Sequence, residues 1–190
     1  VWIGTWKGLN LYDKQTCKII PFPDTRLLDK GINYMAADKE DNIWIGAGNT
    51  IYRCNSTASI AREYDIFGSQ QNKHTINFVY QDREGNMWVL TGGGLFKYDD
   101  KSDSFITYPP LGKNNAPYTM CQDQSGNYWI GTWGEGLWQF FPQKEGEECY
   151  KRHHIINSRS GETEPIFYSM TQDNTFGYLW LLSLSLIHIS

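Results

Sequence analysis

The sequence predicts an all-β fold: a fragment of a β-propeller with about four to five four-stranded antiparallel blades, its ring incomplete. Two observations predict this fold class. Tryptophan recurs at positions 2, 44, 88, 129 and 180, with gaps of 42, 44, 41 and 51 residues, and a period in the forties is typical of propeller blades. Within one period, short runs of β-favouring residues alternate with turns rich in Gly and Asp, and no helical periodicity competes with them.

Each later tryptophan follows an aspartate at a nearly constant spacing, six residues in three copies and seven in the last. An aspartate at the end of a strand can accept hydrogen bonds from the backbone of the turn that follows it. A buried indole removes roughly 150–250 Å² from water, so we expect the tryptophans to wedge between neighbouring blades. The predicted structural residues of the repeat are Trp2, Trp44, Trp88, Trp129, Trp180, Asp38, Asp82, Asp123 and Asp173.

The repeat divides the chain into five predicted blades, of which the first lacks its innermost strand and the last stops inside its second. The chain opens in the middle of a strand pattern, so we expect it to be cut from a longer protein. Residues 184–190 break the repeat and read like a translated sequencing-library adapter, so we predict that they are not native. The predicted blades are residues 1–24, 32–67, 76–108, 117–156 and 166–183.

The charge and the cysteines exclude several kinds of site. The chain has a formal net charge of −4, which disfavours a nucleic-acid partner because no basic patch would neutralise phosphates. Its four cysteines are far apart and match no zinc or redox motif, and Cys149 with His153 and His154 is too loose a cluster to predict a metal site. We expect no cofactor and no metal. No apolar run approaches the ~20 residues of a membrane helix.

The string from Val1 to Asp13 resembles the two-component regulator propeller repeat, as does Asp123–Thr132 followed by Gly136 and Leu137. The resemblance extends over residues 1–183, with weaker fits in the second and fifth blades. It implies the periplasmic sensor region of a hybrid two-component system, whose full-length form would be a histidine kinase. It also implies a small-molecule ligand, an oligosaccharide, and as partners the remaining blades, the downstream signalling domains and a second copy in a homodimer.

The candidate ligand-binding residues lie at one end of the predicted blades, where the loop between the second and third strands meets the start of the innermost strand. Exposed aromatic rings there can stack on sugars, and amides can bond hydroxyl groups. Alternatively, the loop tryptophans pack between loops and the other residues cap strands. The loop residues are Trp6 and Trp133, and the residues five positions before each repeat aspartate are Asn33, Asn77, Tyr118 and Tyr168.

Two other function classes stay open at the level of sequence. One is a carbohydrate- or protein-binding propeller scaffold outside signalling, and the other is a propeller hydrolase or lyase. Glycoside hydrolysis needs two carboxylates that converge in space, and Glu145, Glu147 and Glu148 are predicted to lie in a solvated loop. We therefore expect no catalysis within this segment.

Overall fold

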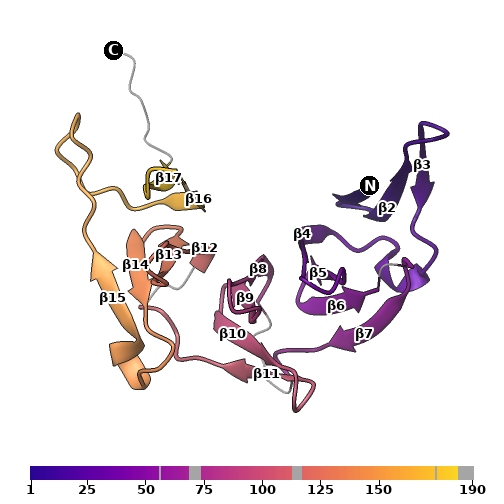
Figure 1. The fold of residues 1–190 in the computed structure, drawn as a ribbon, viewed down its shortest axis with the longest axis horizontal. Helices are drawn as coiled ribbons and strands as arrows, with labels where there is room; N and C mark the ends of the chain where they lie inside the picture. The colour runs from indigo at the N-terminus through magenta and orange to yellow at the C-terminus, as the bar shows by residue number, and fades with distance from the viewer. Residues whose placement is uncertain (56, 69–73, 113–116, 174, 184–190) are drawn as a thin grey trace. The chain divides into compact units, whose positions relative to one another are not determined.

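The computed structural model describes residues 1–55, 57–68, 74–112, 117–173 and 175–183, and the suspected adapter sequence at 184–190 lies outside them. The described residues form five antiparallel sheets of two to four strands, none of them closed, so the predicted all-β propeller fragment is confirmed (Figure 1). In every sheet, strands adjacent in sequence are hydrogen-bonded neighbours, which makes each sheet a simple meander. The bounds of the native blades stay a prediction.

The strands follow the pattern of short β-favouring runs and turns. The first sheet contains β1 (Trp2–Thr5), β2 (Gly8–Asp13) and β3 (Lys18–Pro21); the second β4 (Ile32–Ala37), β5 (Ile43–Ala47), β6 (Thr50–Cys54) and β7 (Ile60–Tyr64); the third β8 (Ile76–Gln81), β9 (Met87–Thr91), β10 (Gly94–Asp99) and β11 (Ser104–Thr107); the fourth β12 (Pro117–Gln122), β13 (Tyr128–Thr132), β14 (Leu137–Phe140) and β15 (Tyr150–His153); the fifth β16 (Phe167–Gln172) and β17 (Leu179–Ser183).

Helical structure among the described residues is limited to two short 3₁₀ turns, Thr25–Leu27 and Gly146–Cys149. Within that part of the chain, no helix has the length and apolar character needed to cross a bilayer. The chain divides into two compact units, residues 1–89 with 96–106, and residues 90–95 with 107–190.

In the first unit, the second sheet contributes to a core cluster on each of its two faces, since side chains alternate between the faces along each strand. On β5, Ile45 belongs to a core cluster with Leu9 and Phe22 of the first sheet and its following loop. Its neighbour Trp44 points the other way, into a cluster with Ile76 and further residues of the third sheet. The innermost strands β4 and β8 also lie against each other. This face-to-face stacking of successive sheets is the arrangement that the repeat predicted.

The second unit repeats this packing between the fourth and fifth sheets. Cys121 of β12 and Leu137 of β14 form a buried cluster with Phe167 and Met170 of β16, and Trp129 packs against its edge. The innermost strands β12 and β16 lie against each other here as well. A single kind of interface therefore occurs in both units.

A glycine two residues after the repeat tryptophan allows the strands of successive sheets to approach closely. A Cβ atom on Gly46 would lie 2.6 Å from Cγ2 of Ile76, and one on Gly131 would lie 2.7 Å from the carbonyl oxygen of Phe167. Real Cβ atoms do not come this close to a backbone oxygen, so Gly131 has no room for a side chain.

We expect Gly131→Ala to lower the free energy of unfolding by about 1–3 kcal/mol, because the added methyl group overpacks the interface with β16. Denaturant unfolding of the intact protein measures the loss. Ser125→Ala, in the exposed turn between β12 and β13, is the control and should change stability by less than about 0.5 kcal/mol. Equal stability of both variants would mean that β13 and β16 do not approach in solution.

Candidate ligand-binding site

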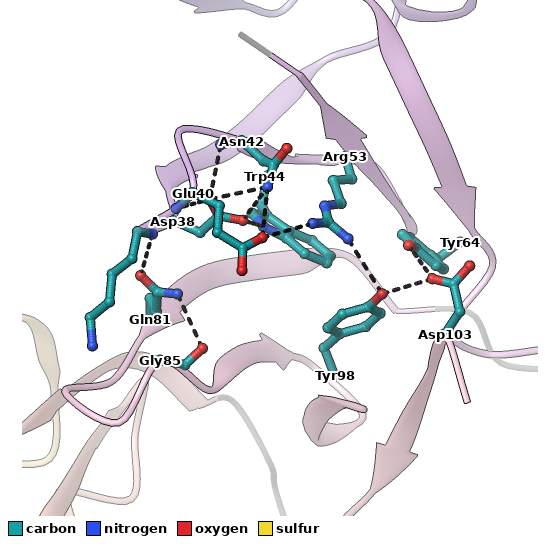
Figure 2. Close-up of polar contacts among 11 residues, drawn as sticks. Asp38, Glu40, Asn42, Trp44, Arg53, Tyr64, Gln81, Gly85, Tyr98 and Asp103 are labelled. Carbon is teal, nitrogen blue, oxygen red and sulfur yellow. Dashed lines mark hydrogen bonds and ion pairs between the residues drawn. The ribbon is translucent and has the colours of Figure 1, made fainter. Parts of the chain in front are cut away.

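The repeat aspartate and tryptophan are joined by a hydrogen bond in the second to fifth sheets. Trp44 Nε1 donates to Asp38 Oδ2 at 2.7 Å, while Oδ1 of the same carboxylate accepts the backbone N–H of Asn42 at 2.9 Å (Figure 2). The equivalent indole bonds measure 2.8 Å in Asp82–Trp88, 2.8 Å in Asp123–Trp129 and 3.4 Å in Asp173–Trp180. The hydrogen bonds from the aspartate to its turn were predicted from the sequence. The hydrogen bond from the indole to the aspartate was not predicted, although the constant six-residue spacing between Asp and Trp indicated it.

The hydrogen bonds lower the pKa values of Asp38 and Asp123. Burial alone would raise the pKa of Asp38, but the hydrogen bonds from Trp44 and Asn42 more than offset this, so its pKa lies below the usual value. The pKa of Asp123 is lowered in the same way, by bonds from Trp129 and Asn127 acting against burial. The carboxylates of Asp38 and Asp123 are therefore ionised at neutral pH and serve to order their turns.

Burial of the repeat tryptophans depends on what lies beside them. Trp44 and Trp88 are buried, Trp2 and Trp129 are half-buried, and Trp180 is 55% exposed. Trp180 lies on β17, which pairs only with β16 among the described residues. The indole of a repeat tryptophan is thus buried where a further sheet covers it.

A polar network surrounds Trp44 at the end of the sheets where Asp38 lies. The Arg53 guanidinium lies 5.2 Å from the centre of the Trp44 ring and pairs with Glu40 at 3.3 Å. Asp103 accepts hydrogen bonds from the hydroxyl groups of Tyr64 and Tyr98, both at 2.7 Å (Figure 2). These contacts tie the second sheet to the third, and we interpret them as structural.

Three of the predicted binding residues occupy β-bulges at the opposite end of the sheets. Ile32 pairs with Ala47 and Tyr34 with Gly46, so Asn33 is an extra residue with no partner on β5. The register shifts in the same way around Tyr118 on β12 and around Tyr168 on β16. A bulge re-aims a side chain and is common beside binding sites. No residue pattern announced the bulges, which arise from strand register.

The bulge residues differ in what their side chains contact. The Asn33 Oδ1 accepts the backbone N–H of Gly48 at 2.9 Å, so this amide supports the loop between β5 and β6. Tyr118 is 38% exposed, whereas Asn33, Tyr168 and Asn77 are half-buried. Asn33 therefore combines the capping role considered above with a position at the candidate surface.

Trp6 lies in the loop between β1 and β2 with 82% of its surface exposed. Gly31 lies beside the indole, and a Cβ added to it would come within 3.1 Å of the ring atom Cε3. The same loop is anchored by a bridge between Gly8 and Leu28. The indole therefore contacts the chain near Gly31 and presents most of its surface to solvent.

Trp133 occupies the same kind of loop in the second unit, between β13 and β14, and is 48% exposed. Its backbone forms a bridge with Ile166, just before β16. The ring centre of Tyr118 lies 5.6 Å from that of Trp133, with the planes tilted by 47°. The structure therefore brings together Trp133 and Tyr118, two residues that the sequence places fifteen positions apart.

Comparison with protein families identifies the repeat around this second pair. Residues 111–134, which include Asp123, Trp129 and Trp133, match the family described as the two component regulator propeller. This segment is one copy of the two-component regulator propeller repeat. The match explains the shared spacing of Asp, Trp, Gly and Thr in this segment. A comparison of the whole chain with curated proteins finds no match.

Solved structures resemble this chain over nearly its whole length. They include the extracellular domain of BT4673 from B. thetaiotaomicron, assigned to the one component or hybrid two component systems, with a TM-score of 0.76 and 23% identity. The extracellular domain of BT3049 from the same organism, assigned to the hybrid two component systems, has a TM-score of 0.71 and 23% sequence identity. Virginiamycin B lyase from Staphylococcus aureus has a TM-score of 0.70 and 16% sequence identity. At these sequence identities, the structural similarity shows that the proteins share a fold.

The matches cover 96%, 95% and 96% of this chain in the order given. In the other direction, the chain spans 24% of each of the two extracellular domains and 59% of the lyase. The chain thus spans about a quarter of the length of the two extracellular domains that it resembles.

Proposed function

We propose that this segment is the ligand-sensing part of a periplasmic two-component sensor and that it responds to oligosaccharides. The observation that carries the proposal is the pair of exposed indoles, Trp6 and Trp133, each held in the same loop of its sheet. A solvent-exposed indole suits stacking on the apolar face of a sugar ring. The regulator propeller repeat and the extracellular neighbours support the sensing role.

The proposal extends to the whole protein. Ligand binding would bias the arrangement of a homodimer, and the segments after the propeller would pass that bias to a histidine kinase. Such coupling requires that the ligand bind the two arrangements with different affinity. No catalytic step is assigned to the present segment.

We expect Trp133→Ala in the intact protein to weaken oligosaccharide binding about five- to tenfold, without lowering the melting temperature. Loss of one stacking interaction of about 1–1.5 kcal/mol gives an effect of this size. A screen of immobilised oligosaccharides identifies the ligand, and calorimetric titration then compares the variants.

The control is Phe176→Ala, which removes an aromatic ring that is 73% exposed in the turn between β16 and β17, at the other end of the sheet. The affinity of Phe176→Ala for the oligosaccharide should equal that of the parent protein. If Trp133→Ala lowers the melting temperature while binding persists, the indole is a packing residue and the proposed site is wrong.

A further inference from the structure

Trp6 forms one wall of a surface depression in the first unit, at the end of the sheets that carries the candidate site. The depression has a volume of about 440 Å³, which accommodates one or two sugar rings in size. It opens between the loop after β1, the segment before β4 and the loop after β5. The aromatic, charged and polar side chains that line it are Trp6, Lys30, Asn33, Asn49, Thr50 and Thr75.

The polar groups in this depression suit a polyhydroxyl ligand. Asn33 uses its oxygen for the N–H of Gly48, which leaves the two N–H groups of its amide as donors. Asn49, Thr50 and Thr75 supply a second amide and two hydroxyl groups, and no described residue forms a hydrogen bond with these three side chains. Amide and hydroxyl groups beside an open indole face provide both contacts that a sugar requires.

The charge in the depression adds a preference. Lys30 is the one charged residue among those that line it, and none of the lining residues is acidic. Lys30 Nζ donates to the hydroxyl group of Tyr52 at 2.5 Å, and this hydroxyl donates to Glu63 at 3.1 Å. The Tyr52 contact holds the ammonium group in place and uses one of its three N–H donors, so two can serve an anion.

A second hollow in the same unit has a different charge pattern, because acidic residues line it. A cavity of about 130 Å³ beside Arg53 is lined by four carboxylate residues, Asp38, Glu40, Glu84 and Asp100. In a chain of net charge −4, a solvent-open hollow lined by a lysine and by no carboxylate is therefore a local feature of the Trp6 loop.

We propose that the Trp6 depression selects a sugar carrying a carboxylate, a uronic acid residue, with the ring on the Trp6 indole and the carboxylate on Lys30. This inference rests on the proposed function and narrows its ligand class. Charge-assisted hydrogen bonds between ammonium and carboxylate groups are shorter and stronger than neutral ones, so the anionic sugar gains a contact that its neutral counterpart lacks.

Calorimetric titration of the intact protein with cellobiouronic acid and with cellobiose tests the preference. We expect the acidic disaccharide to bind about tenfold more tightly at low salt, and this ratio to fall as salt is added. Lys30→Gln should bring the affinity for the acidic disaccharide down to that for cellobiose and leave cellobiose binding unchanged. Lys30→Arg, which keeps the charge, should retain most of the preference.

Lys101→Gln is the matched control, because this exposed lysine lies in the turn between β10 and β11, outside the depression. The inference is overturned if Lys30→Gln leaves the affinity ratio unchanged, if it weakens both disaccharides equally, or if neither disaccharide binds. Melting temperatures of all variants separate misfolding from lost contact. A Trp6-dependent response to neutral oligosaccharides alone would overturn the acidic preference and leave the sensing proposal standing.

Discussion

Replacing Trp44 with alanine is expected to lower the free energy of unfolding by about 3–5 kcal/mol, the range for truncating a buried large aromatic residue. Trp44 is 2% exposed and packs edge-on against Tyr98, with 4.9 Å between ring centres, and near-parallel to Tyr64 at 5.9 Å. Its removal opens a cavity between the second and third sheets and leaves the Arg53 guanidinium without the ring that it covers.

Chemical denaturation of the intact protein measures this loss. Trp6→Ala is the matched control, because it deletes the same side chain from a position that is 82% exposed, and it should cost less than about 1 kcal/mol. A loss below about 1 kcal/mol for Trp44→Ala would show that the second and third sheets do not stack through this residue. The loss of unfolding free energy for Trp44→Phe should fall between those for Trp44→Ala and Trp6→Ala, because phenylalanine keeps a ring but loses the hydrogen bond to Asp38.

Replacing Asp38 with alanine is expected to cost about 2–3 kcal/mol at neutral pH. Its carboxylate accepts the indole N–H of Trp44 and the backbone N–H groups of Glu40 and Asn42. A buried donor that loses its acceptor costs about 1–3 kcal/mol. The Trp44 indole is the buried donor here, while the turn N–H groups are nearer to solvent and can bond water.

The cost should depend on pH. The pKa of Asp38 in the folded protein lies below its ordinary value, because hydrogen bonds from Trp44 and Asn42 outweigh the opposing effect of burial. The carboxylate therefore contributes stability above the unfolded pKa of about 3.9, and this contribution is lost as pH falls through the folded value. The stability difference between the parent protein and Asp38→Ala should thus be constant from about pH 7 to 5 and narrow below about pH 4.

Urea titrations at several pH values, compared between the parent and the variant, check this expectation. Comparing the two proteins at each pH cancels the titration of the other repeat aspartates, which both proteins retain. Asp41→Asn serves as the control for a lost surface charge, because Asp41 is exposed in the same turn and asparagine tolerates its positive φ of 62°. A difference that stays unchanged down to about pH 3 would mean that the Asp38 carboxylate is not the acceptor for Trp44.

The positions of the strands could be predicted from local information. The runs from Ile76 to Gln81 and from Met87 to Thr91 are rich in β-favouring residues and end at turn residues, and strand alternation is a property of adjacent residues. The role of the repeat aspartate in ordering its turn is equally local, since Asp38 and Asn42 are four residues apart. Family resemblance added the sensing function, which no residue spacing contains.

The candidate site could be predicted only in part. Its aromatic residues were recognisable because Trp6 and Trp133 follow the same strand in their repeats. Lys30, Asn49 and Thr75 were missed because they come from different segments of the chain, and nothing in their neighbourhood distinguishes them from other surface residues. They join Trp6 only where successive sheets meet.

Local sequence was sufficient for the β-meander, the Asp-ordered turns and the repeat itself, because each depends on residues within a few positions of one another. Tertiary structure decided which repeat tryptophans are buried, which residues occupy bulges and which side chains surround Trp6. Burial of Trp44 requires residues from the third sheet, whereas Trp180 with the same motif stays 55% exposed. The physical reason is that burial and strand register are set by contacts between distant segments, and a repeated motif is identical whether or not a neighbouring sheet covers it.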